Sequence, residues 1–319
     1  LGANTTGANN TAIGYGALDA NTTAANNTAV GYACLGANTT GTSNVAMGFG
    51  TLDANTTASN NTALGYNALT TNTTGASNVA LGTESLASNT TANFNVAIGV
   101  NALTTNPDGT ENVAVGYNAL QAVDGGDSNV GMGNAAGFAM TGGGNNIFIG
   151  KDAGRTGSPG GNITSASNTL SLGDENIATA NIQVDWTVAS DARDKTDFTA
   201  LDLGLDFVKA LAPVTYKWDK RSKYGDKTAD DYDLTSQTPD GTHKEDWLDI
   251  GFKAQEVEAL EIAAGYNKSS KTNLVSSHTG DGKQMGLQYS KFVPILVKAI
   301  QEQQALIEAL TARITTLEG

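Results

Sequence analysis

The stretch NTAIGYGAL at residues 10–18 returns along the chain at a constant interval of 17 residues. Seven consecutive units keep this interval, and each has a glycine, a leucine and an asparagine at fixed places. These residues are Gly14, Gly31, Gly48, Gly65, Gly82, Gly99 and Gly116; Leu18, Leu35, Leu52, Leu69, Leu86, Leu103 and Leu120; and Asn10, Asn27, Asn44, Asn61, Asn78, Asn95 and Asn112. Two further units carry Gly137 and Gly154 in place of the leucine, and a looser unit, NTLSLG, follows an inserted loop at 157–161. A repeat this regular predicts a fold built by stacking.

The length of the unit restricts what each coil can be. Seventeen residues are too few for a βαβ crossover, but they suffice for two strands of about five residues and two turns. Stacked coils rise by about 4.8 Å each, so nine of them predict a rod roughly 45 Å long. We expect the leucines to form a thin core, alanine and glycine to fit where the coil is narrow, and the asparagines to form a ladder of side-chain amide bonds. The fold class is therefore mainly β, with residues 1–173 forming a parallel β-roll or β-helix shaft. Because so thin a coil buries little by itself, we expect it to associate around a threefold axis.

Composition and charge exclude several classes of function. The net charge is −14, and residues 1–189 hold 11 acidic and 2 basic residues, the first basic one being Lys151. A phosphate backbone would be repelled, which argues against a nucleic-acid partner. The single cysteine, Cys34, excludes an intrachain disulfide framework, and the longest apolar run is too short for membrane insertion. A chain that starts at Leu1 is expected to be a fragment or a processed product.

The sequence changes character after the repeats. Residues 174–189 include NIQVDWTV (181–188), which predicts a strand leading out of the shaft, and Ser190-Asp191-Ala192-Arg193-Asp194-Lys195 follows. On a helix Ser190 and Lys195 would lie about 140° apart. They meet only if Ser190 lies in an extended or turn segment and Lys195 reaches back along it, or if the lysine comes from a neighbouring chain. By itself, a serine near a lysine is usually a solvated surface pair.

Other candidate catalytic or binding groups give weaker signals. His243 and His278 lie in polar, loop-like stretches without metal-ligand spacing. Glu256 and Glu258 fall on a short predicted helix, AQEVEALE, and we expect them to be solvated or to lie between subunits. The shaft glycines form no phosphate loop with a following lysine. We therefore expect no metal and no cofactor.

The end of the chain has a heptad pattern. A helix at about 292–318 is predicted, with Pro294 tolerated in its first turn. Its a and d positions are Val293, Leu296, Ile300, Gln303, Ile307, Leu310, Ile314 and Leu317. This pattern indicates a coiled coil; the alternative is one amphipathic helix packed on its own domain. Isoleucine at a with leucine at d favours two strands. A helix at 207–211 and a strand around VTYKW (214–218) predict a small α+β body before it.

Both halves resemble proteins of known families. The pattern N-x-A-(I/V/L/M)-G resembles the head repeats of trimeric YadA-like adhesins and, more closely, shaft repeats of bacteriophage tail fibres. The S-D-x-R-x-K segment, with LGLDFVKALAPVTYKW (203–218), GFKAQEVEAL (251–260) and residues 287–318, resembles the intramolecular chaperone domain of phage endosialidase tailspikes. The same domain occurs in myelin regulatory factor.

The second resemblance implies a reaction and an assembly. In that family the domain assembles a trimer and then cuts itself off before the serine of the motif, using a Ser–Lys dyad. Carried over, Ser190 is the nucleophile, Lys195 the general base, and the Ala189–Ser190 bond is cut. Arg193 is a candidate cationic neighbour or oxyanion partner, and Asp191 would either orient the lysine or cap a following helix. The implied homotrimer disagrees with the two-strand tendency of the heptads; since the seam is short and includes Gln303, we favour the trimer.

Three functions follow as expectations. The first is a virion structural protein, a tail-fibre or tailspike segment assembled in the host cytoplasm, whose shaft takes part in attachment to a host cell-surface receptor or glycan and whose chaperone at 190–319 is released by autocleavage. The second is a trimeric cell-surface adhesin that keeps an uncleaved stalk. The third is an ice- or polysaccharide-binding β-roll, suggested by the recurrent Asn-Thr-Thr at Asn4, Asn21, Asn38, Asn55, Asn72 and Asn89.

Overall fold

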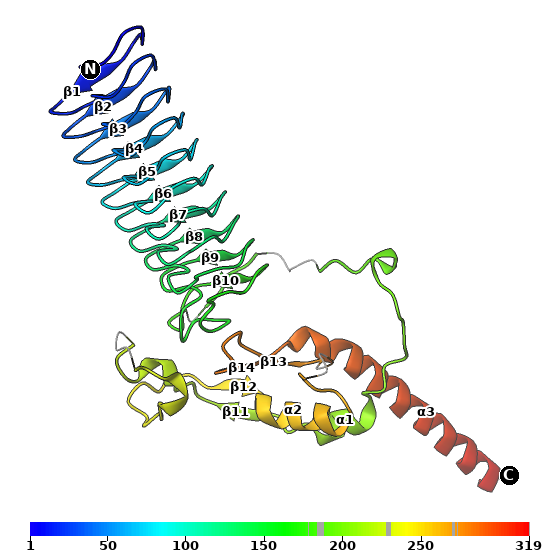
Figure 1. Ribbon diagram of the computed structural model, residues 1–319. Coiled ribbons are helices and arrows are strands. Elements are labelled where there is room, and N and C mark those ends of the chain that lie inside the picture. Colours follow the sequence, from blue (N-terminus) through cyan, green and yellow to red (C-terminus); the bar gives the residue numbers. More distant parts are fainter. Residues whose placement is uncertain (178, 184–187, 228–230, 270–271, 273, 319) are drawn as a thin grey trace. The chain divides into compact units, whose positions relative to one another are not determined.

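A computed structural model describes the chain except for residues 178, 184–187, 228–230, 270–271, 273 and 319 (Figure 1). The chain forms two compact units. The first unit is Leu1–Ala178 with Gly225–Leu234, and the second is Thr179–Tyr224 with Thr235–Gly319.

The first unit is a parallel stack of coils, as the repeat predicts. Its ten strands form one sheet in sequence order, and neighbouring coils pair at a step of one repeat, for example Thr11↔Thr28. Only the last pair has a longer step, Ile147↔Leu170, because the inserted loop lies between them. The strands are β1 (Thr11–Ile13), β2 (Thr28–Val30), β3 (Val45–Met47), β4 (Thr62–Leu64), β5 (Val79–Leu81), β6 (Val96–Ile98), β7 (Val113–Val115), β8 (Val130–Met132), β9 (Ile147–Ile149) and β10 (Leu170–Leu172).

The expectation of two strands of about five residues in each coil is wrong. Among the described residues each coil has a single strand of three residues. Positive-φ residues end the strand and recur along the rest of the coil, as Gly31 (φ 136), Ala33 (φ 55) and Leu35 (φ 52) do in the second one. Strand backbone requires negative φ, so the rest of the coil consists of turns and bends.

The thin core has the expected composition. The seven repeat leucines are fully buried, and alanines such as Ala29, Ala46 and Ala63 are fully buried beside them. In the ninth coil Phe148 takes the inward position of these alanines and is also fully buried. A side chain at Gly154 would lie 2.5 Å from the Phe148 ring, and one at Gly137 would lie 2.7 Å from it. Glycine therefore replaces leucine in the last units to make room for the phenylalanine.

Two columns of buried asparagines connect the coils. In the first, Asn27 Oδ1 accepts a hydrogen bond from the Asn44 backbone N–H at 2.9 Å, and the pattern repeats along the stack. In the second, Asn38 Nδ2 donates to Asn21 Oδ1 at 3.2 Å and to the Gly41 carbonyl at 3.0 Å. The expected column of asparagines is present, but its side-chain oxygens accept mainly from backbone N–H groups. The expected bonds between side-chain amides predominate in the second column, which the Asn-Thr-Thr triplets form.

The second unit is small and of mixed α and β structure. Leu203, Phe207, Val257, Val275 and Ile295 belong to its core. Two antiparallel pairs, β11 with β12 and β13 with β14, lie among its helices. Its elements are η1 (Ala192–Asp194), α1 (Leu205–Ala210), β11 (Val214–Tyr216), η2 (Arg221–Lys223), η3 (Leu234–Ser236), β12 (Asp249–Gly251), α2 (Ala254–Ala263), β13 (Ser276–His278), β14 (Met285–Leu287), η4 (Tyr289–Lys291) and α3 (Phe292–Glu318). Of the strand predicted at 181–188, residues 181–183 are not in a strand, and 184–187 lie outside the described residues.

Helix α3 has two different faces. Phe292, Ile295 and Ala299 are buried against the body of the second unit. The Glu302 carboxylate accepts a hydrogen bond at 2.7 Å from the backbone N–H of Leu205, the first residue of α1. This bond, with Lys298 nearby, holds the pKa of Glu302 below its usual range. The predicted a and d residues are exposed, as is every residue from Gln303 to Glu318. The helix therefore packs on its own domain at its beginning and leaves the heptad seam free.

A buried carboxylate holds α2 to β13. Glu261 is 1% exposed and accepts hydrogen bonds from the backbone N–H groups of Leu274, Val275 and Ser276 at 2.7, 2.6 and 2.9 Å. We expect Glu261→Ala to lower the free energy of unfolding of the second unit by about 3–5 kcal/mol, because three amides lose a charged acceptor. Chemical denaturation followed by circular dichroism measures this loss.

The same helix offers a matched control. Glu256 pairs with Lys253 at 2.7 Å, and both side chains are about half exposed. Exposed ion pairs contribute about 0–1 kcal/mol, so Glu256→Ala should leave the denaturation midpoint nearly unchanged. Equal effects of the two variants would contradict the role given to Glu261.

Candidate functional site

Ser190 and Lys195 lie in contact within one chain. Lys195 Nζ donates a hydrogen bond to Ser190 Oγ at 2.6 Å. Asp191 between them is extended (φ −66°, ψ 130°), the short turn η1 reverses the chain, and Lys195 is extended again (φ −124°, ψ 149°). Of the two arrangements that the sequence leaves open, the structure therefore has the one in which the lysine reaches back along its own segment.

Asp191 and Arg193 bind each other. The Asp191 carboxylate caps η1 by accepting from the Arg193 backbone N–H at 2.9 Å, and it pairs with the Arg193 guanidinium at 2.6 Å from Nη2. These contacts hold the pKa of Asp191 below its usual range and raise the pKa of Arg193. Asp191 thus takes the capping position, one of the two roles considered for it, and its carboxylate bonds to Arg193.

Ser190 presents a hydroxyl group beside an amine. A serine hydroxyl within hydrogen-bond distance of a potential base is the arrangement needed for covalent catalysis, and the carbonyl of Ala189 belongs to the peptide bond directly before it. Both Ser190 and Lys195 are exposed in the single chain. Water therefore reaches the pair, and enclosure would be needed for efficient proton transfer.

The remaining candidates make structural contacts. His278 lies in β13, not in a loop as expected, and its Nε2 is 2.6 Å from Glu258 Oε1. Glu256 pairs with Lys253, and the His243 ring lies edge-on to Tyr224 with centroids 4.8 Å apart. Within the described part of the chain, His, Cys, Asp and Glu form no group of three that fits a metal ion. No described helix is long and apolar enough to cross a membrane.

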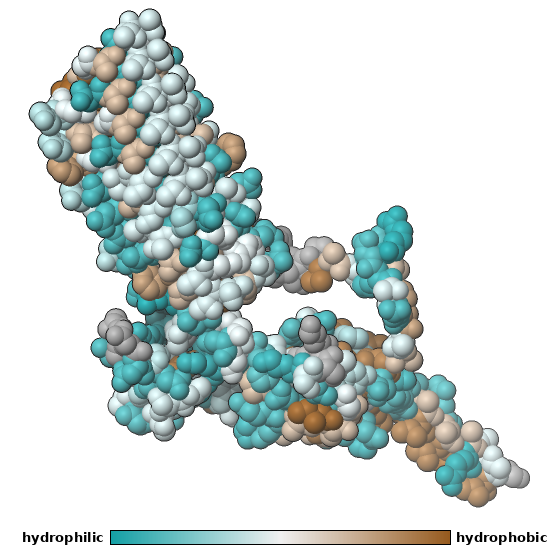
Figure 2. Space-filling view, in the orientation of Figure 1, coloured by the Kyte–Doolittle hydropathy of each residue, from teal (hydrophilic) through white to brown (hydrophobic). Residues whose placement is uncertain are grey.

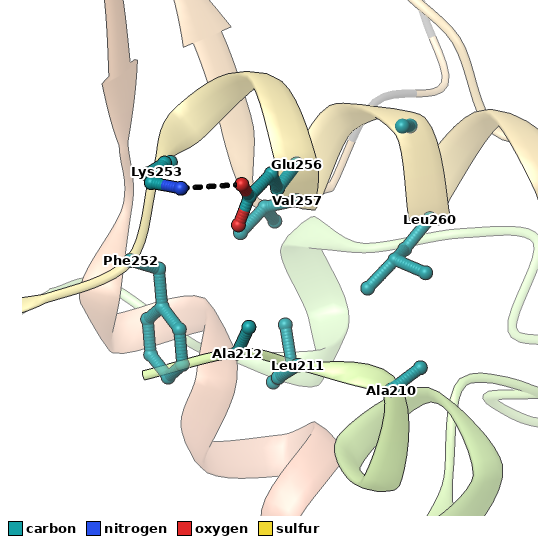
Figure 3. Close-up of a pocket in the computed structure, with 9 residues that line it drawn as sticks. Ala210, Leu211, Ala212, Phe252, Lys253, Glu256, Val257 and Leu260 are labelled. Carbon is teal, nitrogen blue, oxygen red and sulfur yellow. Dashed lines mark hydrogen bonds and ion pairs between the residues drawn. The ribbon is translucent and has the colours of Figure 1, made fainter. Parts of the chain in front are cut away.

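A small apolar pocket of about 260 Å³ lies between α2 and the segment that follows α1 (Figure 3). The side chains of Phe252, Leu211 and Leu260 line it, and the Lys253–Glu256 ion pair lies at its edge. Ligand sites usually occupy about 300–1,000 Å³ and contain converging polar groups. This pocket is smaller, and neither Ser190 nor Lys195 lines it.

Comparison with known proteins adds one finding. Residues 190–266 match the model of a family described as the chaperone of endosialidase, which is known for self-cleaving activity. The searches of curated proteins and of solved structures gave no match. The matched region begins at Ser190 and ends before α3. Over these residues the chain is similar to an intramolecular chaperone of the phage tailspike type.

Proposed function

We propose that residues 190–319 are an intramolecular chaperone that brings three copies of the chain together and is then released by cleavage of the Ala189–Ser190 bond. The observation that carries this proposal is the 2.6 Å contact between Lys195 Nζ and Ser190 Oγ. It lies at the first residue of the region that matches the chaperone family. A chance surface pair has no reason to fall at this boundary.

The reaction has two steps. Ser190 Oγ attacks the carbonyl carbon of Ala189 while Lys195 Nζ accepts the hydroxyl proton, and the peptide C–N bond breaks as the Ser190 nitrogen gains a proton. This leaves an ester between Ala189 and Ser190 Oγ. Water then hydrolyses the ester, giving the Ala189 carboxylate and restoring the Ser190 hydroxyl.

Assembly is proposed to control the first step. A lysine acts as a base only as the neutral amine, which removal from water favours. Ser190 and Lys195 are exposed in the single chain, so neighbouring copies would supply the enclosure. Cleavage would then follow correct assembly, and the released shaft would be held by kinetic stability.

The free seam of α3 supports self-association through a coiled coil. Ile300, Ile307, Leu310, Ile314 and Leu317 are all at least half exposed, and Figure 2 shows apolar side chains along this helix. Such a row is stable in water when it packs into a coiled coil. The trimer, in place of the dimer favoured by the heptad rule, comes from the resemblance to the chaperone family.

A charge placed in the seam tests the dependence of cleavage on assembly. We expect Ile307→Lys to give monomers that stay uncut, lowering the fraction cleaved at least about tenfold, because a buried lysine costs several kcal/mol per ion. Gln301→Lys adds the same charge to an exposed residue outside the seam and should neither change the mass nor reduce cleavage. Sedimentation equilibrium and denaturing gels measure both quantities. Monomers of Ile307→Lys that cut normally would refute the proposed control.

The wider role that we propose is a tail fibre or tailspike in a virion, whose shaft takes part in attachment to a host surface. An adhesin with an uncleaved stalk would show one intact chain. The threonine hydroxyls do not favour ice binding, since Thr22, Thr39, Thr56, Thr73 and Thr90 donate to carbonyls of the next coil.

A further inference from the structure

The strands of the shaft have an unusual orientation. In almost every coil the middle strand residue is buried and the two flanking residues are less buried, as in β3 and β4. The inward residue is a small alanine in most coils, and the outward ones are larger and mostly apolar. A sheet face in contact with water normally carries polar residues. The outward side of this sheet reverses that rule.

We call this side the outer sheet face. It consists of three columns of residues, and each coil contributes one residue to each column. The central column is apolar in all ten strands: Ile13, Val30, Met47, Leu64, Leu81, Ile98, Val115, Met132, Ile149 and Leu172. The column before it contains Thr11, Thr28, Val45, Thr62, Val79, Val96, Val113, Val130, Ile147 and Leu170. The column after it begins with Tyr15, Tyr32, Phe49 and Tyr66, whose rings stack with centroids 5.5, 5.0 and 5.4 Å apart.

The exposed area is large enough for a stable interface. Ile13 is 60% exposed, Tyr15 79% and Leu64 48%, and most of the large apolar residues of the face are comparable to Leu64. With roughly 200 Å² for a fully exposed large side chain, the face presents on the order of 1,000 Å² of apolar surface. A standard interface buries about 800 Å² on each partner, and the largest apolar patch on a typical monomer covers about 300–600 Å².

The charges indicate what covers this face. Its three columns contain no charged residue before Lys151. The acidic residues of the preceding coils, among them Asp19, Asp53, Glu84 and Asp108, lie outside these columns. Two copies would therefore repel each other along other sides and meet without repulsion here. A second copy also presents ridges with the same rise from coil to coil, so the two faces match over their whole length.

We infer that the outer sheet face is the surface by which shafts of different copies pack against one another, around the axis of the assembly. This inference rests on the proposed trimer and adds the surface that forms its centre. It also assigns a role to the alternation of alanine and large residues: alanine keeps the coil thin, and the large side chains form a core that three coils share.

Thiol protection tests the inference on the full chain carrying Ser190→Ala and Cys34→Ala. Alanine stands at the place of Cys34 in the units with Ala17 and Ala68, so the second change should be tolerated. Ile98→Cys places a thiol on the outer sheet face, and Thr91→Cys places one at an exposed position outside it. We expect a maleimide to react at position 98 at least about tenfold more slowly than at position 91 in the assembled protein. Met132→Cys repeats the measurement in another coil, should Ile98→Cys fail to fold.

Sedimentation equilibrium on the same samples separates the two proposals. A trimer whose thiols at 98 and 91 react equally fast overturns the inference and leaves the proposed assembly standing. A monomer with both thiols reactive overturns both. A dimer with position 98 protected would support the buried face and refute the threefold axis.

Discussion

Ser190→Ala is expected to leave the chain in one piece. With the wild-type sequence, a denaturing gel should show fragments of residues 1–189 and 190–319, and the variant should show only the full-length band. Because the substitution removes the attacking oxygen, the rate of cleavage should fall by at least about 10³-fold. Mass spectrometry of the shorter wild-type fragment should find serine at its N-terminus.

Neighbouring residues provide the controls. Lys195→Ala should also stop cleavage, since it removes the amine that contacts Ser190 Oγ. Thr196→Ala removes an exposed hydroxyl from the residue after the lysine, one that bonds to Asp197, and should cut at the normal rate. If Ser190→Ala were still cut at the same bond, Ser190 would not be the nucleophile.

Gly82→Ala is expected to destabilise the shaft strongly. Gly82 has φ 142°, and a Cβ there would lie 2.5 Å from the Gly99 carbonyl oxygen and 2.6 Å from its carbonyl carbon. The neighbour is backbone of the next coil, which cannot rotate away. Strained backbone and the contact together should cost at least about 3 kcal/mol. The rate of unfolding in guanidinium chloride should rise accordingly.

Gly142→Ala is the matched control in the same stack. A Cβ at Gly142 meets nothing within 4 Å, and its φ is not positive. We expect its unfolding rate to remain within about a factor of two of the parent's, since surface changes rarely exceed ~0.5 kcal/mol. Similar rates for both glycine variants would show that the column of glycines is not needed for stacking.

The repeat predicts the parallel stack because a fixed interval between units leaves few other ways for their strands to pair. It predicts the leucine core and the asparagine ladder for the same reason: stacking in register puts identical residues over one another. The number of strands per coil was harder to foresee. Leu35 has a positive φ because of its packing between the coils above and below it. The local conformational preference of leucine does not predict this.

The sequence likewise predicts only part of the candidate site. The motif around Ser190 and its resemblance to the chaperone family single out the right segment, but the contact with Lys195 depends on the extended backbone at Asp191 and Lys195. Nothing in the sequence singles out Glu261, because AQEVEALE has the pattern of a helix with solvated carboxylates. Only the position of residues 274–276 in space reveals that this carboxylate is buried.

The uniform pairing of coils affects how the shaft can change in length during evolution. Each coil of the regular region bonds only to the one above and the one below, at a step of one repeat. Recombination between repeat units within the gene could add or remove a whole coil. The coils on either side of the change would then pair through the same surfaces as before. The length of this stack of coils can therefore vary between lineages while its first and last coils stay the same.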